Sequence, residues 1–205
     1  MRRKESEFKT IFFSESGTQK INNDYFGYVQ LDNYAIWVIA DGYDGEEGAN
    51  IASKLSVESA IEYFTAHPRF NKEVIKELFK YTNDTIKQKQ EEMERYSLMH
   101  TSLLIVISNY NKILYGNIGN TRLYHIQGGY IVNQSSDDSV SQLLVQERAL
   151  DIKDIKSHRQ RNDLLQAIGD YSKIKPTISN EIKLLEGDKI CLTTRGAWEN
   201  IDEHE

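Results

Sequence analysis

The stretch VIADGYDGEEGANIAS, residues 38–53, decides how the chain is organised. Its apolar beginning is typical of a buried strand, and that run stops at Asp41 beside Gly42. A glycine-rich loop follows, and a helical pattern begins at Ala49. Taken alone, Asp-Gly after a strand favours a simple turn, and the charges that follow, Asp44, Glu46 and Glu47, are expected to be solvated. Whether Asp41 has a functional role depends on the motifs found elsewhere in the sequence.

Composition places the chain among soluble globular proteins. It has 205 residues, of which 39% are hydrophobic and 27% charged, enough apolar surface for one core. A net charge of −6 argues against nucleic acid and anionic membranes as partners. No stretch in residues 1–205 approaches the roughly 18 apolar residues that span a bilayer, so we expect no membrane contact there.

The cysteine content points to a reducing, cytoplasmic setting. The sequence contains one cysteine, Cys191, which excludes a disulfide framework and a cysteine-based zinc site. Cys191 lies in the apolar segment DKICLTT and is expected to be a core thiol.

The first half of the chain predicts strands and then two helices. Val57, Ala60, Ile61 and Phe64 recur at helical spacing before Pro68, which predicts an amphipathic helix over residues 49–66. A second helix is expected over residues 72–95, packed antiparallel to the first on one outer face of a sheet. Segments rich in aromatic and β-branched residues predict strands at 8–14, 24–31 and 34–40.

The second half predicts an antiparallel meander and a return to strands. The expected strands are 101–108, 112–119, 122–127 and 130–134, with residues 139–169 helical and further strands at 177–185 and 188–194. Two helices set between two runs of antiparallel strands predict an α+β fold. We find no linker or repeat and expect a single domain over residues 1–205.

Six segments, in order, resemble the metal-dependent protein phosphatases of the 2C type (the PPM family). They are GTQKINNDYF, IADGYDGEEGANIAS, LYGNIGNTRLYHI, SSDDS, SHRQRNDLLQAIG and LLEGDKICLTTRGAWENI. The resemblance implies a four-layer α/β/β/α sandwich, with two antiparallel sheets flanked by helices. It also implies a binuclear Mn²⁺ or Mg²⁺ site in a cleft at one end of the sheets.

The same resemblance assigns roles to residues. Asp41 falls where the family places the carboxylate that bridges both metals, Gly42 where a backbone carbonyl binds one of them, and Asp24 at an early metal ligand. Gln19 falls at the family's phosphate-binding arginine, and the adjacent Lys20 is a substitute that would bind phosphate as a point charge. Converging carboxylates need positive charge to hold them together.

Other positions depart from the family pattern. Arg195 stands where an aspartate ligates the second metal, and Asn120 replaces an aspartate that helps to hold a third metal in bacterial members. The family's last strand and last ligand would lie beyond Glu205. We therefore expect at most one weakly bound ion, or none. We also expect the Arg195 guanidinium to pair with Asp41, or with both Asp41 and Asp24, in place of the second metal; the alternative is that it faces solvent.

These departures favour a pseudophosphatase that binds a phosphorylated or regulatory protein without efficient turnover, so the sequence leans against an enzyme. The alternative is a divergent but active metal-dependent phosphatase of phosphoserine and phosphothreonine. A third hypothesis is an architectural domain with an unused cleft. Phosphate release with excess Mn²⁺ separates the second hypothesis from the others.

Overall fold

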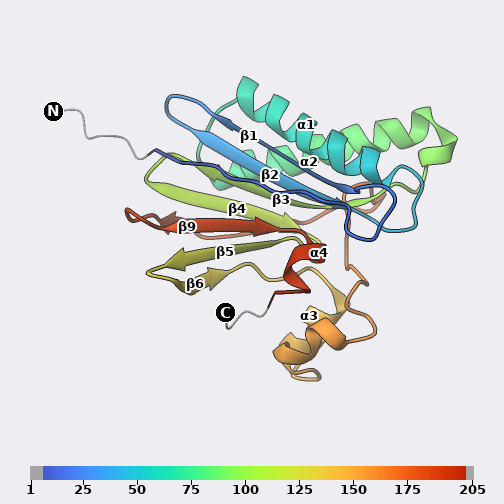
Figure 1. Cartoon of the computed structure of the whole chain (residues 1–205). Helices are drawn as coiled ribbons and strands as arrows, with labels where there is room; N and C mark the ends of the chain where they lie inside the picture. The colour runs from blue at the N-terminus through green and yellow to red at the C-terminus, as the bar shows by residue number, and fades with distance from the viewer. Residues whose placement is uncertain (1–6, 202–205) are drawn as a thin grey trace.

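Two antiparallel sheets stack face to face in a computed structural model that describes residues 7–201 (Figure 1). The larger sheet has the strand order β1-β2-β3-β4-β7, with β8 also paired to β4, and the smaller has the order β6-β5-β9. The larger sheet consists of β1 (Asp24–Gln30), β2 (Ala35–Gly42), β3 (Thr101–Ser108), β4 (Lys112–Ile118), β7 (Thr177–Ile178) and β8 (Ile182–Lys183). The smaller consists of β5 (Arg122–Gln127), β6 (Tyr130–Gln134) and β9 (Lys189–Thr193).

Two long helices cover the outer face of the larger sheet, as expected (Figure 1). They are α1 (Ala49–Ala66) and α2 (Lys72–Glu92). Helix α2 begins where the Asn71 side chain accepts a hydrogen bond from the Val74 N–H at 2.8 Å. It ends three residues before the expected boundary, and a short 3₁₀ helix, η1 (Glu94–Tyr96), follows. Shorter helices, α3 (Val140–Gln146) and α4 (Arg195–Trp198), lie at one end of the smaller sheet (Figure 1).

The apolar core has two layers. One lies between the helices and the larger sheet and includes Ile36, Val38 and Phe79. The other lies between the two sheets and includes Leu104 and Leu123. The structure therefore confirms the predicted α+β sandwich of two antiparallel sheets flanked by helices.

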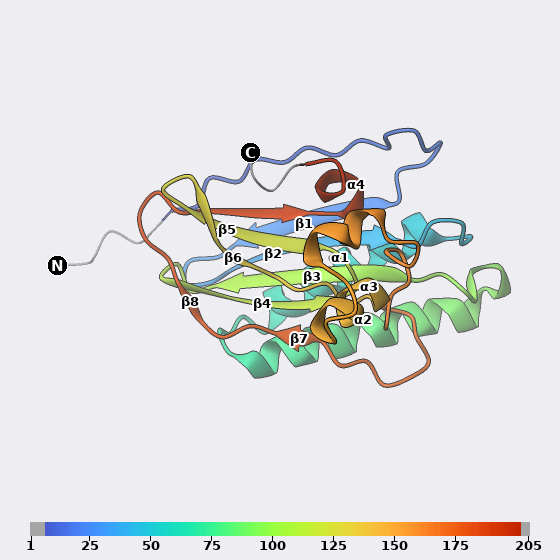
Figure 2. The same ribbon diagram turned by 90° about the horizontal axis from the view of Figure 1, so that it is seen from below.

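Several expected elements differ in the structure. Residues 8–14 form no strand, and Figure 2 draws them as an irregular coil. Aromatic contacts hold this segment instead. Phe8 meets Trp37 edge to face with ring centroids 4.8 Å apart, and Phe12 packs at a tilt against Phe26 with centroids 4.3 Å apart. Its composition suits a strand, but no neighbouring backbone in residues 7–201 forms a ladder with it.

The region 139–169 is less helical than expected. It contains only α3 and a 3₁₀ helix, η2 (Ile152–Ser157), within its otherwise irregular path. Ser141 is the buried residue of α3, so this helix lacks the apolar stripe that stabilises a longer one. The expected strand at 177–185 is likewise reduced to the two short strands β7 and β8.

Cys191 is exposed, so its prediction as a core thiol is wrong. Its neighbours Ile190 and Leu192 pack against the core between the sheets. Because successive strand residues point to opposite faces, Cys191 points outward. Within residues 7–201, no helix has the length and apolar character needed to cross a membrane.

Candidate functional site

Two carboxylates face each other at the end of the larger sheet. Asp24 opens β1, Asp41 lies next to the end of β2, and the two are direct partners in the antiparallel pairing of these strands. Directly opposite side chains lie on the same face of a sheet with Cβ atoms roughly 4.5–5.5 Å apart. Like charges in this arrangement are destabilising, so the pair needs a proton or a cation.

Burial accounts for most of the electrostatics of this pair. Burial first, and then the nearby charge of Asp24, raise the pKa of Asp41 from its ordinary value to about 7. Burial also raises the pKa of Asp24, although the Thr194 hydroxyl, which donates a hydrogen bond to Asp24 Oδ2 at 2.6 Å, acts in the opposite direction. The site therefore holds a proton more readily than ordinary carboxylates do, and it has the negative charge that a cation would relieve.

Gly42 lets the loop after β2 close against helix α1. A Cβ atom at this position would lie 2.2 Å from the Ala49 carbonyl oxygen, so no larger residue fits. The Gly42 N–H donates to the Asn23 carbonyl at 3.0 Å. Because Gly42 follows Asp41 and Asn23 precedes Asp24, this bond holds the backbone next to both aspartates. The turn that looks ordinary in the sequence is thus a tight contact that positions Asp41.

Arg195 touches Asp41 through its backbone, which corrects the expected ion pair. Its N–H donates to Asp41 Oδ2 at 3.3 Å, while its guanidinium pairs with Asp44 and donates to Asn162 Oδ1 at 3.3 Å. Glu199 lies 3.8 Å from the same guanidinium. Among residues 7–201, no guanidinium bond to Asp41 or Asp24 is present. Its charge nevertheless contributes to lowering the pKa of Asp41.

Asn120 lies in a buried scaffold behind α4. Its carbonyl accepts a hydrogen bond from Trp198 Nε1 at 2.8 Å, and the Arg122 guanidinium stacks 3.6 Å from the Trp198 ring. Arg122 binds Asp137 through two hydrogen bonds of 2.8 and 2.7 Å. These contacts anchor α4, and with it Thr194 and Arg195, beside the aspartate pair.

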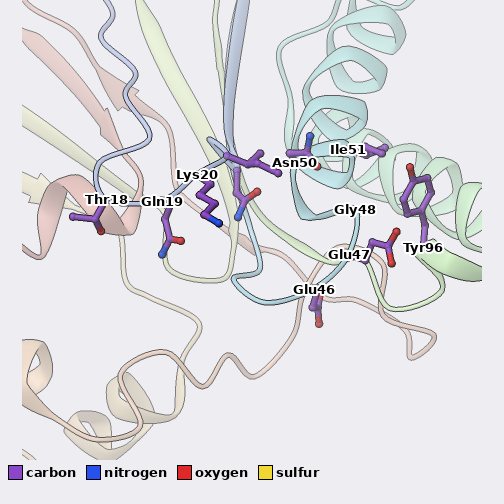
Figure 3. Close-up of a pocket in the computed structure, with 11 residues that line it drawn as sticks. Thr18, Gln19, Lys20, Glu46, Glu47, Gly48, Asn50, Ile51 and Tyr96 are labelled. Atoms are coloured by element: carbon purple, nitrogen blue, oxygen red, sulfur yellow. The ribbon is translucent and has the colours of Figure 1, made fainter.

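The phosphate-binding candidates Gln19 and Lys20 line a pocket next to the aspartate pair. The pocket has a volume of about 660 Å³, and its wall includes Asn23, the residue before Asp24. Figure 3 shows Gln19 and Lys20 facing the loop that carries Glu46 and Glu47.

Contacts with distant segments hold this loop, and none of them was predicted from the sequence. Glu46 accepts hydrogen bonds from the backbone N–H of His100 at 2.9 Å and pairs with its ring Nδ1 at 3.1 Å. Asp44 pairs with Arg195. The expectation of a solvated charge is therefore wrong for Glu46, whereas Asp44 and Glu47 are exposed as expected. His100 lies far from the loop in sequence, and no local pattern reveals this contact.

The aspartate pair can hold one hydrated cation. Within the described part of the chain, no group of three or more His, Cys, Asp or Glu residues converges on one point. Mg²⁺ commonly keeps several waters and takes only one or two protein carboxylates, and Asp24 with Asp41 supplies that number. The pKa of Asp41 is raised because its negative charge is buried beside that of Asp24, and a bound cation would offset this negative charge.

Comparisons with known proteins agree on one family. The family model described as protein phosphatase 2C matches residues 14–203. The protein phosphatase PhpP of Streptococcus pneumoniae is 27% identical over 197 residues, which cover 94% of this chain and 80% of that protein. The serine/threonine phosphatase stp of Listeria monocytogenes is 24% identical over 83% of this chain and 69% of its own length.

Solved structures share the fold. The serine/threonine phosphatase Stp1 from Staphylococcus aureus superposes with a TM-score of 0.86 at 22% identity, covering 100% of this chain and 83% of that one. The catalytic domain of the phosphatase PstP, solved with two manganese ions, gives a TM-score of 0.77 at 19% identity, covering 91% of this chain and 76% of that one. At these identities, the structural likeness shows the fold alone.

Proposed function

The chain belongs to the protein phosphatase 2C family, and from this premise we propose that it is a metal-dependent phosphatase of phosphoserine and phosphothreonine in proteins. The relatives that cover most of the chain are named as phosphatases, several as serine/threonine phosphatases. A phosphorylated protein is accordingly the proposed substrate.

The prediction against an enzyme is wrong in the light of these relatives. That prediction rested on Arg195 and Asn120 as departures from the family's metal ligands. The contacts of Arg195 are compatible with activity, because its side chain is held by Asp44, Asn162 and Glu199 and does not occupy the carboxylates of the two aspartates.

The buried pair of Asp24 and Asp41 is the observation that carries the proposal. Bound Mn²⁺ or Mg²⁺ supplies positive charge for phosphoryl oxygens and makes hydroxide available near neutral pH. In this chain Asp41 and Asp24 would hold the ion, together with the Gly42 carbonyl that the family resemblance indicates. The Thr194 hydroxyl and the Arg195 N–H orient the two carboxylates. We propose one hydrated ion at this pair.

Lys20 is the proposed phosphate-binding side chain, with Gln19 beside it. An ammonium group attracts the phosphate as a point charge and lacks the two-pronged geometry of arginine. We therefore propose that binding of the substrate phosphate is weaker and less directional here than at an arginine.

The test compares phosphopeptides of one sequence that carry phosphothreonine, phosphoserine or phosphotyrosine. The expected result is Mn²⁺-dependent phosphate release from the first two, abolished by EDTA and reduced at least about 100-fold in Asp41→Asn, the range in which removal of a key electrostatic group lowers catalysis. Asp84→Asn, on the exposed face of α2, is the matched control and should keep full activity. Equal rates in Asp41→Asn and the control would refute the proposed site.

A further inference from the structure

The pocket beside Lys20 has two walls of different character. One wall is the segment Thr18–Ile21 with Asn23, and the other is the start of α1 with Glu46, Glu47 and Tyr96. In Figure 3, Lys20 and Glu47 lie on opposite sides of the opening, with Asn50 and Ile51 along its upper edge. At about 660 Å³, the pocket has room for a long side chain.

Two opposite charges in this pocket lack partners in the described part of the chain. Glu47 and Lys20 are exposed, and among residues 7–201 neither takes part in an ion pair or a side-chain hydrogen bond. Glu46 differs, because its carboxylate already pairs with the ring of His100. The pocket therefore offers one available anion and one available cation to a ligand.

The wall that carries Glu47 is firmly built. Gly48 adopts a φ of 88°, and a Cβ atom there would lie 2.8 Å from the Tyr96 ring, so the loop packs directly on this tyrosine. The Arg95 guanidinium already stacks on the Tyr96 ring at 4.4 Å. Tyr96 and Ile51 thus supply apolar wall for the stem of a side chain, and Glu47 supplies the charge that recognises its end.

The pocket begins next to the aspartate pair. Asn23 lines it, precedes Asp24 in the chain and accepts the hydrogen bond from Gly42. A peptide whose phosphorylated residue reaches Asp24 and Asp41 would place a neighbouring side chain over this opening, because extended residues advance roughly 3.3 Å each.

We infer that this pocket selects substrates that carry an arginine or lysine within a few residues of the phosphorylated one. Glu47 pairs with the basic side chain, while Lys20 faces the phosphate. This inference rests on the proposed phosphatase function and adds the class of sequence that the enzyme prefers.

The test uses phosphothreonine peptides that differ at one position, scanned on both sides of the phosphothreonine, with arginine, alanine or glutamate there. In the wild-type chain with Mn²⁺, kcat/KM for the arginine peptide should exceed that for the alanine peptide about fivefold at the best position, the value of one partly exposed ion pair. Glu47→Lys should reverse the order and favour the glutamate peptide. Glu62→Lys, the same change at an exposed position of α1, should keep the wild-type order.

Two further readouts separate this inference from the proposed function. Aryl phosphate lacks a peptide, so its hydrolysis should be equal in the wild type, Glu47→Lys and Glu62→Lys. If no substrate is hydrolysed, the proposed function fails, and fluorescence anisotropy with the same peptides still measures the charge preference. Equal affinity for the arginine and alanine peptides at every position, or the same preference in both variants, would overturn the inference.

Discussion

Replacing Asp41 with asparagine should stabilise the metal-free chain at neutral pH. The two residues have nearly the same shape, and an asparagine oxygen can still accept the hydrogen bond from the Arg195 N–H. The asparagine removes a buried carboxyl whose pKa is raised from an ordinary 3.8 to about 7. This difference in pKa corresponds to about 4 kcal/mol of folding free energy, at 1.36 kcal/mol for each pH unit. Because Asp24 adjusts to the change, this figure is an upper bound.

The sign follows from proton linkage. Between about pH 4 and pH 7 the folded chain retains a proton on Asp41 that the unfolded chain has released, so Asp41 lowers stability as the pH rises through this window. The difference in stability between Asp41→Asn and the wild type should therefore grow from pH 4 to pH 7 and then level off. Urea unfolding in EDTA at a series of pH values measures it. A difference that is constant over this range, or a variant that is less stable at pH 8, would refute the reasoning.

Three other substitutions test the frame around this pair. Gly42→Ala should lower the free energy of unfolding by about 3 kcal/mol, because its Cβ would meet the Ala49 carbonyl, and unchanged urea unfolding would contradict that packing. Asp137→Asn should cost about 3 kcal/mol by removing the charge that faces the buried Arg122, and a thermal melt within 2 °C or so of the wild type would argue against it. Arg195→Ala should raise Mn²⁺ affinity about threefold or more by removing a cation near Asp41; calorimetry showing weaker binding would count against this electrostatic account.

The sequence predicts those parts of the fold whose signals are local. The helical spacing that stops at Pro68 matches α1, and the side chain of Asn71 caps α2. The apolar runs before Asp41 and around residues 101–108 match strands β2 and β3. The segment at 8–14 fails because a strand also needs a partner, and composition does not reveal whether one is present.

The candidate site was predictable only where its residues belong to local sequence motifs. Asp24, Asp41 and Gly42 stand out by their places in ordered motifs, and the structure brings the two aspartates together. The direction of the Arg195 side chain depends on Asp44 and Asn162, which arrive from two distant loops. Such contacts between distant segments follow from tertiary packing, and the pattern of charges along the chain does not determine them.

The number of phosphate ions released per chain tests the central claim most directly. The chain is incubated with an excess of phosphothreonine peptide and Mn²⁺, and released phosphate is counted over time against the concentration of folded protein. Our account predicts a linear rise far beyond one phosphate per chain, and no rise in EDTA. A yield that stops at or below one phosphate per chain, or is the same in EDTA, would contradict it.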